Sequence, residues 1–314
     1  MPLQVVDVKK KSIIITGAAS GLGLAYAKAL AQRGARVMLN DIVRDADGEF
    51  LIIKIRDEIN KEGGTVFANT SDISTKSGVK ALVEQTMAQC NTIDGIVHNA
   101  GVYQDKCLRD TPENLWNKII NVHLNSLYYL TKEVTPIMER QNYGRLIFIT
   151  SSVGMYGVCG NTAYGAAKMA VIGFMNSLSL ELAEYDIKCN TISPLATTAY
   201  ASTNIHEDIR KDFSTDAAAQ LCSYLCSPLC KISGRVIIAG GGCFSSVGFM
   251  EGEVTYLDIK HISAENISSH IEEIIDLRKG IYVSNIHKAA KKLLKAIHKG
   301  KHNNAIAENQ DNKD

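Results

Sequence analysis

Three side chains in the middle of the chain could transfer a proton together. Tyr164 and Lys168 form a Tyr-x-x-x-Lys pair in a segment of helical pattern, and Ser151 precedes Tyr164 by 13 residues. A spacing of four places two side chains on one face of a helix. A phenol with a pKa of about 10 is a poor base at neutral pH, but a fixed ammonium close by stabilises its phenolate. Such a pair alone is common on helix surfaces, so its meaning depends on what accompanies it.

A glycine-rich turn near the N-terminus could bind a dinucleotide. Residues 16–23 read T-G-A-A-S-G-L-G, between the apolar run Ile13–Ile15 and the helical stretch Leu22–Ala31. A strand, turn and helix of this kind direct backbone N–H groups and the positive end of a helix at a pyrophosphate. The same glycine pattern also serves plain packing. The residues expected to contact the cofactor here are Gly17, Ser20, Gly21, Leu22 and Gly23.

An acidic residue ends the second predicted strand. Asp41 lies 18 residues beyond Gly23, where a carboxylate can accept both hydroxyls of a ribose and would repel a 2′-phosphate. Its position therefore favours NAD over NADP, and the alternative is a cap of the turn in N-D-I. Asp72 and Ile73, after the third predicted strand, could border the adenine, although an Asx turn explains Asp72 nearly as well.

The pattern of the chain predicts a sheet that would bring these residues together. Short apolar runs alternate with helical segments, which is typical of parallel strands joined by crossover helices. We therefore expect a doubly wound α/β domain of the Rossmann type with about seven strands, whose ligands bind beyond the carboxyl ends of the strands. The predicted strands are Ile13–Thr16, Arg36–Asn40, Thr65–Asn69, Gly95–His98, Leu146–Thr150, Ile187–Ile192 and Arg235–Ile238.

The alternation stops after about residue 245, and the pattern then indicates a helical extension. Segments Ser263–Leu277 and Ser284–His298 read as two amphipathic helices, interrupted at Lys279 and Gly280. We expect a catalytic domain over 1–245, an extension over 246–300 that packs on the domain or a partner subunit, and a frayed polar tail over 301–314. An apolar stripe would make that contact, and it consists of Ile267, Ile271, Ile274 and Ile275. Basic residues would face solvent or, less simply, a phosphate; they are Lys288, Lys291, Lys292, Lys295 and Lys299.

Composition limits the partners and the compartment. The 34 Lys and Arg residues nearly balance 33 Asp and Glu residues, so no net field attracts nucleic acid or an anionic membrane. No apolar run approaches the ~18 residues of a membrane span. The eight cysteines are scattered and no secretory segment precedes them, which favours a reducing cytoplasmic compartment. Cys222, Cys226 and Cys230 recur every four residues, but nothing completes a metal set, so we expect no metal.

Taken together, these motifs resemble the short-chain dehydrogenase/reductase family over roughly residues 8 to 245. The resemblance is carried by the glycine turn, the N-A-G motif after the fourth strand, Ser151 and the Tyr164/Lys168 pair. It implies that Tyr164 is the acid/base, that Lys168 binds the nicotinamide ribose and lowers the tyrosine pKa, and that Ser151 hydrogen-bonds the substrate oxygen. It also implies further cofactor contacts, from Asn99, Ala100, Gly101, Pro194 and Thr197.

Three positions depart from the usual pattern of that family. His123 takes the place of an asparagine on the fourth helix that anchors a water in the proton relay. A histidine with a pKa of about 6.5 could relay protons itself or could simply pack. His98 replaces the commoner asparagine before N-A-G, and Leu195 replaces the glycine that usually follows the proline, which puts the conformation of that loop in doubt.

A closer resemblance extends to about residue 298. The stretches W-N-K-I-I-N-V-H-L, Y-G-R-L-I-F-I-T-S-S, C-N-T-I-S-P and S-A-E-N-I-S-S-H-I-E-E-I-I-D-L are similar to the (3R)-hydroxyacyl-CoA dehydrogenase modules of type 2 peroxisomal multifunctional enzymes. This implies NAD-dependent oxidation of 3-hydroxyacyl-CoA to 3-oxoacyl-CoA in β-oxidation. The chain ends in N-K-D rather than in a peroxisomal Ser-Lys-Leu tripeptide.

The motif residues are also compatible with other functions. The enzymatic alternatives are a 3-oxoacyl-thioester reductase and a hydroxysteroid dehydrogenase, and the non-enzymatic one is an NAD(H)-sensing regulatory protein on the same fold. The family's usual subunit contacts involve the fourth and fifth helices, here about Glu113–Met138 and Thr162–Ala183. We therefore expect a symmetric homodimer or a higher homo-oligomer.

Overall fold

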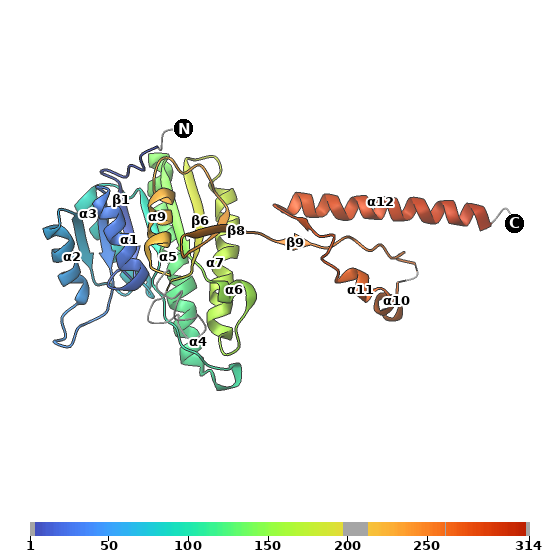
Figure 1. Ribbon diagram of the computed structural model, residues 1–314, viewed down its shortest axis with the longest axis horizontal. Helices are drawn as coiled ribbons and strands as arrows, with labels where there is room; N and C mark the ends of the chain where they lie inside the picture. The colour runs from blue at the N-terminus through green and yellow to red at the C-terminus, as the bar shows by residue number, and fades with distance from the viewer. Residues whose placement is uncertain (1–3, 197–212, 261, 312–314) are drawn as a thin grey trace. The chain divides into compact units, whose positions relative to one another are not determined.

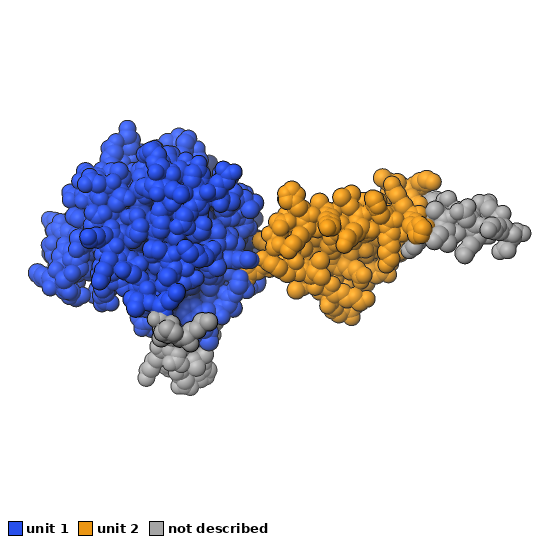
Figure 2. All heavy atoms as spheres, turned by 90° about the horizontal axis from the view of Figure 1, so that it is seen from above, with its two compact units in different colours: residues 1–246 blue, residues 247–314 orange. Residues whose placement is uncertain are grey.

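The chain divides into two compact units, residues 1–246 and residues 247–314 (Figure 2). The first unit is built on an eight-stranded sheet. The computed structural model describes residues 4–196, 213–260 and 262–311. The strands lie in the order β3-β2-β1-β4-β5-β6-β7-β8, and those from β3 to β7 pair in parallel. The doubly wound fold predicted from the sequence is therefore confirmed. The strands are β1 (Ser12–Thr16), β2 (Arg36–Asn40), β3 (Thr65–Asn69), β4 (Gly95–His98), β5 (Gly144–Ile149), β6 (Ile187–Pro194), β7 (Arg235–Gly240) and β8 (Cys243–Val247).

Helices cover the sheet because its strands are apolar on both faces (Figure 1). Successive side chains of a strand point to opposite faces, so Ile13 and Ile15 of β1 share one face and Ile14 lies on the other. Ile13 and Ile15 pack in one buried cluster with helices α1 (Gly21–Gln32), α2 (Leu51–Lys61) and α9 (Asp216–Leu225). Phe148 of β5 contacts Phe174 of α7, with ring centroids 6.0 Å apart.

The helices of this unit follow the strands in the expected alternation. Side chains fix several of their ends: the Thr75 hydroxyl accepts a hydrogen bond from the Gly78 N–H at the start of α3, and Asn91 and Asn142 adopt left-handed conformations after α3 and α5. Their bounds are α1 (Gly21–Gln32), α2 (Leu51–Lys61), α3 (Lys76–Cys90), α4 (Glu113–Ile120), α5 (Ser126–Gln141), α6 (Ser152–Tyr156), α7 (Thr162–Glu181) and α9 (Asp216–Leu225).

Two features of this unit differ from the sequence-based expectation. The single helix expected over Glu113–Met138 consists of α4 and α5, joined by a π-helical turn at Asn121–Asn125. The edge strand β8 was not predicted, because four of its five side chains are exposed and no apolar alternation marks it. The other strand boundaries agree with the expected ones to within two residues.

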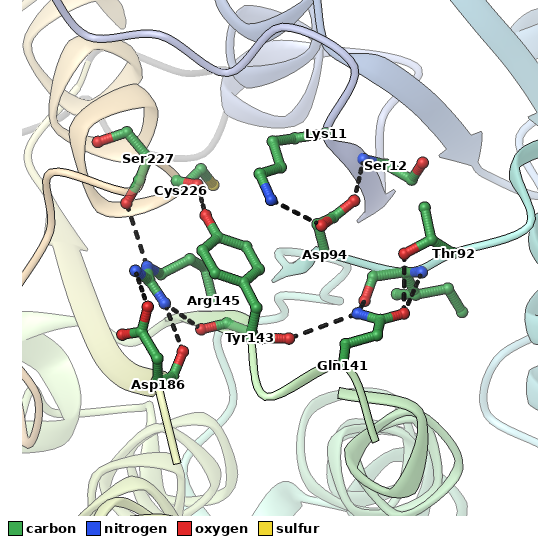
Figure 3. Close-up of polar contacts among 12 residues, drawn as sticks. Lys11, Ser12, Thr92, Asp94, Gln141, Tyr143, Arg145, Asp186, Cys226 and Ser227 are labelled. Carbon is green, nitrogen blue, oxygen red and sulfur yellow. Dashed lines mark hydrogen bonds and ion pairs between the residues drawn. The ribbon is translucent and has the colours of Figure 1, made fainter. Parts of the chain in front are cut away.

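A buried arginine joins the amino ends of the strands, at the edge opposite to the glycine turn (Figure 3). The fully buried Arg145 guanidinium donates hydrogen bonds to the carbonyls of Asp186 at 2.7 Å and Ser227 at 3.1 Å. Its Nη2 also lies 3.4 Å from the Asp186 carboxylate, and the Tyr143 ring stacks beneath it at 4.3 Å. Nearby, Asp94 accepts hydrogen bonds from Lys11 and from the Ser12 N–H. This network fixes the starts of β1, β4, β5 and β6.

In the described part of the second unit, two short strands are accompanied by three helices. Strands β9 (Met250–Glu251) and β10 (Ile281–Tyr282) pair antiparallel, and the helices are α10 (Ala264–Ser269), α11 (Ile271–Ile274) and α12 (Ile286–Asp311). Ser263 starts α10 as expected, since its hydroxyl accepts a hydrogen bond from the Asn266 N–H at 3.1 Å. In the ranges that the structure describes, no helix combines the length and the apolar character needed to cross a bilayer.

The frayed polar tail expected after residue 300 stays a prediction, although the structure assigns helix α12 as far as Asp311. Helix α12 continues through it, because the tail residues include good helix formers and no proline. The isoleucine side chains of the expected stripe, from Ile267 to Ile275, are 40–61% exposed. Of the basic residues singled out in the extension, Lys292 forms an ion pair: its ammonium nitrogen lies 3.3 Å from the Glu251 carboxylate.

Candidate active site

The glycine turn is held against the end of β4 by Asn99. The Asn99 side-chain amide donates to the carbonyls of Thr16 at 3.1 Å and Gly17 at 3.0 Å. In return, the Thr16 hydroxyl accepts hydrogen bonds from the backbone N–H groups of Asn99 and Ala100, both at 3.1 Å. These bonds cross the point between β1 and β4 where the strand order reverses, which is the place where doubly wound sheets bind ligands.

The turn itself requires glycine at two positions. Gly17 has φ of +68°, and a Cβ there would lie 2.7 Å from Ala100 Cα. A Cβ on Gly23 would lie 2.0 Å from the Gly17 carbonyl oxygen. Ser20 precedes α1 but its side chain does not cap the helix, and both Ser20 and Gly21 are exposed, whereas Leu22 is partly buried. The start of α1 thus offers uncapped backbone donors at an open position, which fits the pyrophosphate of a dinucleotide.

Asp41 contacts the same turn from the end of β2. Its Oδ2 accepts a hydrogen bond from the Ala19 N–H at 2.9 Å, and its Oδ1 accepts one from the Val43 N–H at 3.0 Å. The turn-capping alternative is therefore present in the structure. Each carboxylate oxygen has two acceptor positions, so the partly exposed Asp41 retains capacity for ribose hydroxyls.

Asp72 and Ile73 lie after β3. The Asp72 carboxylate accepts the Ser74 N–H at 2.9 Å, which is the Asx turn weighed above, and its side chain is exposed. Ile73 is buried, with 6% of its surface exposed. A contact of either residue with an adenine remains a prediction.

Ser151 and Tyr164 meet beyond the end of β5. Ser151 starts α6, where its hydroxyl accepts the Val153 N–H at 3.2 Å, and it lies close enough to the side chain of Tyr164 on α7 to influence its pKa. Burial of the phenol raises the pKa of Tyr164 to about 12. The neighbouring Ser151 hydroxyl lowers this pKa, but by less than burial raises it. Gly154 lets α6 approach α7, because a Cβ there would lie 2.8 Å from the Met169 nitrogen.

Lys168 lies one helical turn after Tyr164 and is buried, with 4% of its surface exposed. Its ammonium donates a hydrogen bond to the Ile149 carbonyl at 2.7 Å and lies 5.6 Å from the centroid of the Tyr164 ring. Burial lowers the pKa of Lys168 to about 7. The pKa of Tyr164 is raised because burial of the phenol outweighs the other influences, and the lowering of that pKa by Lys168 stays a prediction.

His123 lies in the π-helical turn and packs against Tyr164. Its ring is nearly perpendicular to the Tyr164 ring, with centroids 5.2 Å apart, and its Nε2 lies within hydrogen-bond distance of both backbone groups of Val102. Burial lowers the pKa of His123 well below 6.5, and the charge of Lys168 lowers it further, so the imidazole is neutral. Gly101 is required beside it, since a Cβ there would lie 2.4 Å from His123 Cε1.

His98 supports this turn from β4. The Ser126 hydroxyl donates to the Val122 carbonyl at 2.6 Å, so the contact of 2.7 Å between His98 Nε2 and Ser126 Oγ has the histidine as donor. Burial lowers the pKa of His98 to about 3. His98 therefore acts as a neutral support of the turn that carries His123.

The remaining predicted cofactor residues lie after β6. Pro194 ends that strand and is partly buried, and the Leu195 N–H donates to the Ala239 carbonyl at 2.8 Å, which continues the pairing with β7. The substitution of glycine by Leu195 therefore leaves a regular backbone at this point. Thr197 lies outside the residues that the structure describes.

Sequence reasoning missed residues that surround Tyr164. The Tyr103 ring is nearly perpendicular to the Tyr164 ring, with centroids 5.0 Å apart, and Asp105 and Asn161 hold Tyr103 in place. No spacing rule marks these residues, because they come from two loops that meet only in the fold. Within the described ranges, no group of three or more His, Cys, Asp and Glu side chains is placed to bind a metal ion.

The chain resembles known proteins along most of its length. A sequence model of the short chain dehydrogenase family matches residues 11–211. A Mycobacterium tuberculosis protein named as a short-chain type dehydrogenase/reductase is 31% identical over 274 residues, which cover 86% of this chain and 96% of that protein. The peroxisomal multifunctional enzyme type 2 of Mus musculus is 36% identical over 201 residues, which cover 63% of this chain and 27% of the mouse protein.

A solved structure extends the likeness to the second unit. The full-length peroxisomal multifunctional enzyme type 2 of Drosophila melanogaster superposes with a TM-score of 0.79 at 28% identity, covering 93% of this chain and 50% of that chain. The present chain thus spans half or less of these multifunctional relatives. Members of the matching family are oxidoreductases that typically bind NAD(P), as the glycine turn and the Ser151, Tyr164 and Lys168 group led us to expect. The protein belongs to the short-chain dehydrogenase/reductase family.

Proposed function

We propose that this protein oxidises (3R)-3-hydroxyacyl-CoA to 3-oxoacyl-CoA with NAD. The observation that carries the proposal is the contact of Ser151 with Tyr164 one helical turn from the buried Lys168, beyond the carboxyl end of β5. This group can hold a hydroxyl and accept its proton. The likeness to peroxisomal multifunctional enzymes type 2 supports the acyl-CoA substrate.

The chain's own residues supply positioning and proton transfer. Ser151 donates a hydrogen bond to the substrate oxygen, and the Tyr164 phenolate takes the hydroxyl proton as the carbonyl forms. The Lys168 ammonium stabilises that phenolate and hydrogen-bonds the ribose next to the reacting ring. When bound, NAD supplies the acceptor for the hydride that leaves the carbinol carbon.

His123 has two possible roles beside this group. Its Nδ1 is buried and has no hydrogen-bond partner among the described residues. A neutral imidazole with one free ring nitrogen can pass a proton, but its contact with Val102 also explains its position. We propose the relay role, with packing as the alternative that a substitution would separate from it.

Asp41 supports NAD over NADP. Its carboxylate already fixes the turn through the Ala19 N–H, so it stands beside the backbone groups that would bind the pyrophosphate. The Asp41 carboxylate would repel the 2′-phosphate of NADP at that place, so NADP would bind more weakly than NAD. The contacts of Ser20, Gly21, Leu22, Asp72, Ile73, Asn99, Ala100, Pro194 and Thr197 with the cofactor belong to the same proposal.

The family's subunit contacts and the state of the cysteines support proposals on assembly and location. We propose a symmetric homodimer through α4, α5 and α7, the helices that the family uses, with residues 246–300 as an extension of the catalytic domain. We also propose a reducing, cytoplasmic compartment, because all eight cysteines of the chain are free thiols in the structure.

A spectrophotometric panel tests the function. The purified full chain is assayed by the absorbance of NADH with (3R)- and (3S)-hydroxyacyl-CoA esters of several lengths, and with the free hydroxy acids and a hydroxysteroid as controls. We expect turnover of the (3R) thioesters with NAD and little with NADP. Preference for NADPH and 3-oxoacyl thioesters would identify a reductase instead. Tight NADH binding without turnover of any alcohol would identify a sensor.

A further inference from the structure

Two loops beside the catalytic tyrosine are joined to each other. Residues 101–107 follow β4, and residues 157–161 lead into α7, which carries Tyr164. The Lys106 N–H donates a hydrogen bond to the Gly160 carbonyl at 2.7 Å, and Lys106 and Asn161 form an isolated parallel bridge. Most of residues 101–107 are exposed, so these polar contacts rather than a hydrophobic core hold the segment in place.

Asp105 is the centre of this junction. Its Oδ1 accepts a hydrogen bond from the Tyr103 hydroxyl at 2.6 Å and another from the Asn161 amide at 2.7 Å. Hydrogen bonds to a carboxylate are stronger than those between neutral groups. One oxygen atom therefore connects the segment after β4 with the residue that begins α7.

The Asn161 side chain contacts Asp105 instead of capping the helix that follows it. Asparagine is a favoured residue before a helix, where its side chain normally accepts a backbone N–H, yet Asn161 makes no such cap for α7. A carboxylate only accepts, so the amide nitrogen must face Asp105. Its Oδ1 is then left buried without a partner among the described residues, and Asn161 itself is only 4% exposed.

The contact places an aromatic ring on the catalytic residue. The Tyr103 ring lies nearly perpendicular to the Tyr164 ring at 85°, and the His123 ring does so at 87°. Perpendicular aromatic pairs at such distances are favourable. His123 is positioned by the π-helical turn and Val102, whereas Tyr103 is positioned through its hydroxyl by Asp105.

We propose that Asp105 is a positioning residue for the reaction. Through the Tyr103 hydroxyl it holds the Tyr103 ring against Tyr164, and through Asn161 it ties that ring to the helix that carries Tyr164 and Lys168. The substrate-side surface of the site and the direction of the Tyr164 hydroxyl are thereby set together. This inference rests on the proposed role of Tyr164, so its test has one arm that requires no substrate.

The first arm is amide hydrogen exchange of the full chain, followed by mass spectrometry. Asp105→Ala removes both hydrogen bonds, and we expect peptides that contain Lys106 to exchange about tenfold faster, the factor for losing one bond to a charged group. Asp105→Asn keeps an acceptor oxygen and should stay within about threefold of wild type. Asp110→Ala is the matched control, because Asp110 is an exposed carboxylate just after that segment, and its side chain pairs with its neighbour Arg109.

The second arm is a double-mutant cycle on steady-state kinetics. Asp105→Ala and Tyr103→Phe should each lower kcat/KM for the alcohol about tenfold, with less than twofold change in the KM for NAD. The double variant should lose no more than Asp105→Ala alone, since the bond that Tyr103→Phe removes is one of the two already lost in Asp105→Ala. Additive losses, or equal changes in both KM values, would overturn the proposal.

The two arms separate the inference from the proposed function. A wild-type protein that oxidises no alcohol refutes the function, and the exchange arm then decides on Asp105 by itself. Unchanged exchange in Asp105→Ala overturns the junction whatever the kinetics show. Exchange near the wild-type rate in both Asp105→Asn and Asp110→Ala, with faster exchange in Asp105→Ala, supports the positioning role of Asp105.

Discussion

The Lys168 ammonium donates a hydrogen bond to the carbonyl of Ile149, at 2.7 Å. Ile149 is the last residue of β5, and Ser151 follows it after one residue. The Thr150 hydroxyl donates in the opposite direction, to the Lys168 carbonyl at 2.8 Å. The strand end that presents Ser151 therefore also fixes the helix turn between Tyr164 and Lys168, so the three groups form one rigid unit.

The pKa of Tyr164 predicts how the reaction depends on pH. Because its pKa is raised to about 12, the phenol is protonated at neutral pH and its phenolate fraction grows about tenfold per pH unit below that value. Alcohol oxidation uses the phenolate, so kcat/KM for oxidation should rise from pH 7 to pH 10. The rise should be less than tenfold per pH unit, because Lys168, with a pKa lowered to about 7, loses its charge over the same range. Reduction uses the protonated phenol and should not fall over that range. A plateau of the oxidation profile below about pH 8 would contradict the raised pKa.

Gly17→Ala should abolish tight cofactor binding. The new Cβ would lie 2.7 Å from Ala100 Cα at φ of +68°, so the turn must move. We expect at least about tenfold weaker NADH binding by fluorescence titration, as strain of this kind costs about 1–3 kcal/mol. Gly48→Ala is the control, since Gly48 has φ of +83° with open space around its Cβ position. Equal NADH affinity in the two variants would exclude a cofactor role for the turn.

Asp41→Ser should shift the cofactor preference toward NADP. The change removes the charge that opposes a 2′-phosphate and weakens the contact with the Ala19 N–H. We expect the ratio of kcat/KM with NAD to that with NADP to fall at least about tenfold, a change of about 1.4 kcal/mol. Asp57→Ser controls for the loss of a surface carboxylate, because Asp57 is exposed and pairs with its neighbour Arg56. An unchanged ratio in Asp41→Ser would refute the ribose assignment.

Arg145→Met should destabilise the fold without touching the active site. It leaves the carbonyls of Asp186 and Ser227 without their donor at the opposite edge of the sheet (Figure 3). We expect a loss of about 3 kcal/mol in the free energy of unfolding, measured in urea. Arg109→Met removes an arginine whose side chain is 86% exposed, and it should change stability by less than about 0.5 kcal/mol. Similar unfolding midpoints for both variants would show that the buried network contributes little.

The strands and the glycine turn could be predicted because local chemistry determines them. Runs such as Ile13–Ile15 are apolar on both faces, and the position of Gly17 permits no side chain. The parallel, doubly wound sheet followed from the crossover pattern, and so did the expectation that Ser151, Tyr164 and Lys168 lie at one edge of it.

Contacts between distant loops could not be predicted in the same way. The π-helical turn at Asn121–Asn125 depends on His98 and Ser126, which lie on different elements, and nothing in the local sequence marks it. Tyr103 and Asn161 are 58 residues apart, and both donate hydrogen bonds to Asp105. The raised pKa of Tyr164 also depends on burial, which a residue spacing does not reveal.

The most direct test compares Tyr164→Phe with the wild type in two measurements on the same preparation, turnover of the (3R)-hydroxyacyl-CoA and the dissociation constant for NADH. The substitution removes one oxygen atom and leaves the ring that packs between Tyr103 and His123. We predict that kcat falls by at least about 10³-fold, while NADH binding changes by less than about threefold. Turnover by Tyr164→Phe near the wild-type rate would show that another group transfers the proton, and the proposed chemistry would be wrong.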